Sequence, residues 1–189
     1  MAQLLMLAGI VFSSADIPVD RAGAAVKAMT GSMRENGIWW TCHYLEAGAD
    51  PEDEPRADRA DVLWRDRVKP WLRRVWPHEL DYRSPGLSDR FATLAAATNA
   101  EFPDAVAFLS RFLVKSDALL ALHRLSGTSH PDRHPAETLQ LLNAVFDLDT
   151  SWIPNEVRGI MNRIALAQPD LKEDPIFRRF TNRILRQPN

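Results

Sequence analysis

Apolar residues recur at helical spacing along most of this 189-residue chain, and prolines separate one apolar segment from the next. Trp64, Val68, Trp71 and Val75 fall at i, i+4, i+7 and i+11, which places them on one face of a helix. The 13 prolines outnumber the eight glycines, and proline ends a helix or occupies its first turn. No segment shows the two-residue alternation of a strand. The sequence therefore predicts an all-α fold of eight or nine helices in antiparallel hairpins, as a HEAT-like or an irregular helical bundle.

Three helix starts share an apolar-Pro-polar-x-apolar pattern: WPHEL at Trp76, FPDAV at Phe102 and IPNEV at Ile153. Their prolines, at positions 77, 103 and 154, lie 26 and 51 residues apart. A period of this length favours stacked helical hairpins of the solenoid type over a closed four-helix bundle. Because unrelated helices also accept Pro in their first turn, both arrangements stay open.

One acidic segment divides the chain. Four acidic residues lie between Asp50 and Glu54, bracketed by Pro51 and Pro55. We expect residues 1–49 to form an N-terminal helical part, residues 50–57 an acidic loop, and residues 58–189 the main helical domain, packed with the N-terminal part as one unit. No Lys or Arg precedes the apolar run from Leu4 to Phe12, and the run is too short to cross a bilayer, which favours a buried first helix over a signal peptide.

The overall composition is that of a globular protein, with 46% hydrophobic and 25% charged residues. The net charge of −2 and pI near 6.2 argue against a dedicated nucleic-acid module, whose pI usually exceeds about 9. Cys42 is the only cysteine, so the chain forms no intrachain disulfide. A reducing, cytoplasmic compartment is expected, without membrane insertion.

The stretch from Asp61 to Leu80 holds three of the six Trp residues among four Arg and one Lys. A nucleic-acid surface needs aromatic and basic side chains on the same face, since stacking and phosphate contacts act together. Here the apolar residues share one face and the basic residues lie largely off it, which favours a helix packed into the core. A partner-protein surface, a nucleic-acid surface and a membrane surface are the alternatives. Pro70 predicts a kink or a restart of this helix.

No catalytic, phosphate-binding or zinc motif occurs in the sequence. His130 and His134 in HPDRH are spaced like a helical metal pair, but Pro131 and Pro135 favour a polar surface loop. DLDTS, from Asp147, opens like a calcium loop without its Gly and its twelfth-position Glu. We therefore predict no catalytic residue, no metal site and no cofactor.

Several phrases occur in an order that resembles one group of proteins. They are LWRDRVKPWLRRVWP, LSDRFATLAAATNAEFPDAVAFLSRFLV, LHRL, HPAETLQLLNAVFDLDTSWIPNEVRGIMNRI and PDLKEDPIFRRF. Between Trp39 and Phe180, the chain resembles the helical C-terminal region of large bacterial SIR2-family or nucleotide-hydrolysing proteins of anti-phage defence. The resemblance implies an accessory region that scaffolds or senses. The NAD-cleaving or NTP-hydrolysing residues of such proteins lie in other domains, so none is carried over here.

We expect a non-catalytic helical interaction module of a larger bacterial assembly, binding a protein partner, other domains of a longer chain or a second copy. The residues predicted to contact a partner are Trp39, Trp40, Arg73, Arg74, Trp76 and Trp152. The alternative is a nucleic-acid-binding helical domain that uses Arg65, Arg67, Lys69, Arg73 and Arg74. A third hypothesis, a small enzyme with an unrecognised site, requires a polar pocket with convergent carboxylates or His.

Overall fold

In the computed structural model, the described residues are 24, 28, 31–47, 54–75, 84–149 and 152–186, and every regular element among them is a helix. The all-α prediction is therefore confirmed. The first helix predicted around Leu4 to Phe12 lies outside the described residues, and before Gly31 the structure describes only Ala24 and Ala28, where the Ala28 amide donates to the Ala24 carbonyl at 3.0 Å. The elements are α3 (Gly31–Ala47), α4 (Glu54–Leu63), η1 (Trp64–Val68), α5 (Lys69–Val75), α6 (Pro85–Ala96), α7 (Phe102–Leu109), η3 (Ser110–Phe112), α8 (Leu119–Ser126), α9 (His130–Arg133), α10 (Pro135–Val145), α11 (Asn155–Ala167), η4 (Pro169–Glu173) and α12 (Pro175–Leu185).

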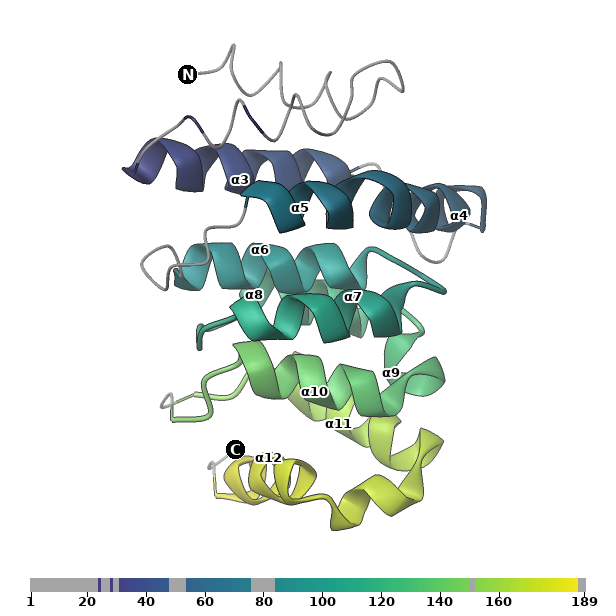
Figure 1. Ribbon diagram of the computed structural model, residues 1–189. Coiled ribbons are helices and arrows are strands. Elements are labelled where there is room, and N and C mark those ends of the chain that lie inside the picture. Colours follow the sequence, from purple (N-terminus) through teal and green to yellow (C-terminus); the bar gives the residue numbers. More distant parts are fainter. Residues whose placement is uncertain are drawn as a thin grey trace.

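The helices are stacked in layers (Figure 1). Among the described elements, α3, α4 and α5 form one end, α6, α7 and α8 form the next layer, and α9, α10 and α11 follow. Helix α12 lies at the opposite end and packs on α10, α11 and η4. The described elements are thus helices packed in layers, as the all-α prediction requires. Their arrangement as a HEAT-like repeat stays a prediction.

One hydrophobic core runs through the layers. Trp64 and Trp71 are buried in it, so the interpretation of the Trp-rich stretch as a core helix is confirmed. The core residues of the later helices also follow their sequence spacing. The largest fully buried aromatic side chains beyond these two are Phe91, Phe102, Phe146 and Phe180.

Pro70 changes the helix without ending it. Helical structure continues from Glu54 to Val75, and five residues just before the proline, Trp64–Val68, are π-helical. The Lys69 N–H donates to the Trp64 carbonyl, five residues back. Proline lacks the N–H that the Asp66 carbonyl would accept and its ring crowds that carbonyl. A wider turn relieves this crowding, so the helix passes Pro70 through a π-helical turn, while the predicted kink stays a prediction.

Two predicted boundaries are corrected. The N-cap of α6 is Ser84, whose Oγ accepts from the Leu87 N–H at 3.2 Å, because Pro85 starts the helix earlier than expected. Ser88, whose place in the sequence before the apolar residues Phe91 and Leu94 also makes it a possible N-cap, is instead buried within α6, and its Oγ accepts from the Val114 N–H at 2.8 Å. The acidic loop predicted over 50–57 is wrong for its last four residues, which start α4; residues 50–53 lie outside the described residues.

The prediction of a polar surface loop at HPDRH is also wrong. Residues His130–Arg133 form the short helix α9. The His130 side chain is fully buried and stacks on Phe102 with ring centroids 4.0 Å apart. Its Nε2 lies 3.2 Å from the Ala96 carbonyl oxygen. An imidazole has two apolar faces, so one hydrogen bond and a stacked ring allow its burial.

Candidate functional site

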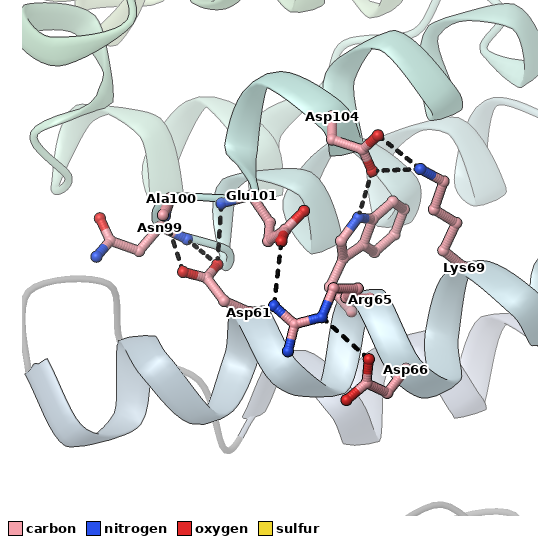
Figure 2. Close-up of polar contacts among 9 residues, drawn as sticks. Asp61, Arg65, Asp66, Lys69, Asn99, Ala100, Glu101 and Asp104 are labelled. Atoms are coloured by element: carbon pink, nitrogen blue, oxygen red, sulfur yellow. Dashed lines mark hydrogen bonds and ion pairs between the residues drawn. The ribbon is translucent and has the colours of Figure 1, made fainter.

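Polar side chains between Asp61 and Lys69 contact residues 99–104, at the start of α7 (Figure 2). We call this set of contacts the polar seam. Asp61 on α4 accepts hydrogen bonds from the backbone N–H groups of Asn99, Ala100 and Glu101, at 2.8, 2.8 and 3.2 Å. These donors lie just before Phe102, the first residue of α7. Asp61 thus satisfies three successive backbone donors of the turn that leads into α7, close to the positive end of that helix.

A second carboxylate lies one turn further along the seam. Asp104 accepts from the Trp64 Nε1–H at 2.9 Å, and the Lys69 Nζ lies 2.6 Å from each of its oxygens. Partial burial acts to raise the pKa of Asp104, but the hydrogen bonds from Lys69 and Trp64, with the Lys69 charge, lower it below its usual value. Sequence reasoning missed both carboxylates, because each partner lies 35 or more residues away.

The five residues predicted for nucleic-acid binding differ in their ion pairing and in their exposure to solvent. Arg65 pairs with Asp66 at 3.0 Å and with Glu101 at 3.5 Å, and Lys69 pairs with Asp104. Arg73 is exposed, and its guanidinium carbon lies 5.6 Å from the centroid of the Phe108 ring. Of the remaining two, Arg67 is half-buried and Arg74 is exposed. The positive charges of Arg65 and Lys69 are thus matched by carboxylates of this chain.

Two of the predicted partner-binding residues, Trp39 and Trp40, belong to an aromatic and cationic cluster on α3. Their rings pack edge to face at 5.0 Å, and the Arg90 guanidinium lies 4.3 Å above Trp39. Arg90 Nη1 also lies 3.2 Å from Nδ1 of His43. Burial first, and the Arg90 charge second, lower the pKa of His43. The contacts with Arg90, on α6, hold Trp39 against the second layer, and Trp40 remains 39% exposed.

The other predicted contact residues do not join this cluster. Trp152 is 57% exposed and lies just before α11, in a layer separated from α3 and α5 by α6, α7 and α8. Arg73 and Arg74 end α5. Trp76 lies outside the described residues. The predicted set therefore does not form one surface, and its role in partner binding stays a prediction.

Sequence reasoning missed a groove between the last two long helices. The α11–α12 groove has a volume of about 590 Å³ and apolar lining residues from both helices. Those from α11 are Met161 and Ala165, and those from α12 are Phe177, Ile184 and Leu185. The available signal was the apolar content of α12, since Phe177 and Leu185 lie beside the face that Ile176, Phe180 and Ile184 define.

In the described part of the chain, the charged residues that line the groove are all basic. Arg158, Lys172 and Arg178 line it, together with the neutral polar residues Asn162, Thr181 and Asn182, and no Asp or Glu does. Arg178 forms an exposed ion pair with Glu173. The groove thus offers an apolar surface with cations around it and no carboxylate suited to acid–base chemistry.

Within the described ranges, no group of three or more His, Cys, Asp or Glu side chains is placed to hold a metal ion. No helix of the described part has the length and apolar character that crossing a membrane requires.

Comparisons with known proteins add no relative: no protein family, curated protein or solved structure matches this chain. The resemblance to SIR2-family defence proteins accordingly stays a prediction.

Proposed function

We propose that this protein is a non-catalytic helical scaffold or interaction module of a larger assembly. The observation that carries the proposal is the α11–α12 groove, an apolar surface at the end of the helical stack that the described residues leave uncovered. Apolar surface that stays open to water in a folded chain marks a binding site. The sequence resemblance extends the proposal to a cytoplasmic bacterial assembly, with anti-phage defence as its setting.

The polar contacts support a structural use of the charged residues. Asp61 and Asp104 join α4 and α5 to α7. Arg163 of α11 donates to the carbonyls of Ser126 and Thr128 and pairs with Asp132 of α9. Such contacts fix the helices relative to one another, which is what a rigid binding scaffold requires.

The nucleic-acid alternative has less support. The seam matches Arg65 and Lys69 with carboxylates of the chain itself. Binding a phosphate there would require breaking these pairs, and the acidic partners would remain beside the phosphate.

The test is co-expression of the tagged chain with each protein encoded beside its gene. We expect a stoichiometric complex with at least one of them, or a concentration-dependent self-association, measured by light scattering after size exclusion. The isolated chain should consume neither NAD⁺ nor ATP. A chain that stays monomeric with every neighbour, or that turns over either nucleotide, would overturn the proposal.

A further inference from the structure

We infer that the α11–α12 groove binds an amphipathic helix of a partner protein that carries Asp and Glu on the borders of its apolar face. The inference rests on the proposed function and names the chemistry of the partner.

The walls of the groove have the geometry of helix packing. On α11, the lining residues Arg158, Met161, Asn162 and Ala165 fall at i, i+3, i+4 and i+7. The ridges of a third helix fit the furrow between two helices whose side chains repeat at this spacing. Recognition of this kind uses apolar anchors at i, i+3 or i+4, and i+7 of the bound helix.

Helix α12 also lacks a neighbour on one side. In each of the other layers, longer helices lie beside one another, whereas among the described elements at its end of the stack α12 has only the short helix η4 with it (Figure 1). Phe177 and Phe180 are buried against the preceding layer, but Leu185 is 75% exposed in the groove. A helix laid beside α12 would cover Leu185 and complete the layer.

The charge of the groove selects the partner. Among the described residues, three cations and no carboxylate line it, in a chain whose net charge is −2. Helix α12 adds to this field, since four Arg and no acidic residue occur from position 175 to 186. The pair between Arg178 and Glu173 is exposed, and an exposed pair is weak enough for a partner carboxylate to replace it.

The apolar residues of the groove favour a peptide helix over a polyanion as its ligand. In the lining, Leu185 is exposed, and Ala165 and Ile184 are only partly buried. A phosphate chain would leave these side chains without an apolar contact. A peptide helix with an apolar face satisfies both the cations and the apolar residues.

The experiment is selection of helical peptides from a display library on the intact chain, followed by fluorescence anisotropy with the enriched peptides. We expect the enriched sequences to place apolar residues at i, i+3 or i+4, and i+7, with Asp or Glu beside them. Replacing those acidic residues by Lys should weaken binding by about tenfold or more, because it brings like charges together across the interface.

Matched variants locate the site. Leu185→Asp and Lys172→Glu change groove residues and should each abolish or strongly weaken binding. Their controls are Leu166→Asp and, on α4 at the other end of the stack, Arg59→Glu, which change exposed residues outside the groove lining and should leave binding unchanged. Thermal denaturation should be alike for all four variants, because none of these side chains is buried.

Three results would overturn the inference. The library yields no binder, or its binders are basic, or they are insensitive to Leu185→Asp. Two further results would assign the groove differently: self-association that only Leu185→Asp abolishes indicates a second copy, and oligonucleotide or anionic-vesicle binding that Lys172→Glu reduces and Leu185→Asp spares indicates a polyanion. If a stoichiometric complex with a neighbouring gene product forms in spite of both groove variants, the inference fails and the proposed function stands.

Discussion

Lys69 Nζ lies 2.6 Å from both carboxylate oxygens of Asp104, which joins the helix after the π-helical turn to α7. The same carboxylate accepts the only polar hydrogen of Trp64, a side chain that is otherwise buried in the core. One acidic residue thus fixes the register between the Trp-rich helix and the second layer.

Asp104→Ala should therefore destabilise the fold. The change leaves the Trp64 Nε1–H and Lys69 without their acceptor, which costs about 1–3 kcal/mol. Urea denaturation followed by Trp fluorescence measures the free energy of unfolding. Asp66→Ala, at an exposed residue of the same helix, should change it by no more than about 0.5 kcal/mol. Equal effects of the two variants would contradict the importance of the seam.

The contribution of Asp104 should depend on pH. Its pKa is lower in the folded chain, so the contribution is complete above the pKa of an unfolded Asp, about 3.9. It is lost as the pH falls through the lower folded pKa. The difference in unfolding free energy between wild type and Asp104→Asn should shrink from pH 5 towards about pH 2. A difference that is constant over this range would show that ionisation of Asp104 contributes nothing.

Removing the Asp61 carboxylate should weaken the start of α7. Asp61→Ala deletes the acceptor for three backbone N–H groups, and loss of a helix cap costs about 0.5–2 kcal/mol. Hydrogen exchange at Asn99, Ala100 and Glu101 should accelerate more than exchange in α11. The control is Asp58→Ala, at an exposed residue one turn earlier. It should change neither the free energy of unfolding nor hydrogen exchange at residues 99–101.

Cys42 should be unreactive in the folded chain. Its thiol is fully buried, and burial raises its pKa to about 12 although the Arg90 charge acts to lower it. Because the thiolate is the reactive form, alkylation by iodoacetamide at pH 8 should be slow in buffer and fast in denaturant. Mass spectrometry of the alkylated protein measures both rates. Complete alkylation of the native protein within minutes would contradict the burial of this thiol.

The nucleic-acid alternative has its own test. With two of the five basic residues paired, we expect no retardation of short DNA or RNA on native gels at low salt. The double variant Arg73→Glu, Arg74→Glu should behave like the wild type. Retardation that falls steeply with salt and disappears in this variant would favour the alternative.

Local patterns were enough to place individual helices. The spacing of Trp64, Val68 and Trp71 identified a buried face, because the helical period is a property of neighbouring residues. Pro103 was placed correctly in the first turn of α7 for a similar reason. The same local rules failed for Ser84 and Ser88, since either serine is chemically able to cap a helix and the start at Pro85 decides between them.

The contacts between helices could not be predicted in this way. The pairing of Asp61 with residues 99–101 and of Lys69 with Asp104 depends on the register of two packed helices. His130 was expected at the surface because the nearby Pro131 and Pro135 are typical of a loop. Phe102 and Ala96, which are distant in sequence, provide its buried environment.

By itself, then, the sequence determined that this chain is helical and which faces of its helices are apolar, because periodicity acts within a few turns. The tertiary structure decided which of those apolar faces are covered. Phe180 is buried against the preceding layer, while Leu185, five residues later on the same helix, is left exposed beside the cations of the groove. Coverage depends on the neighbours that packing provides, and no local pattern records them.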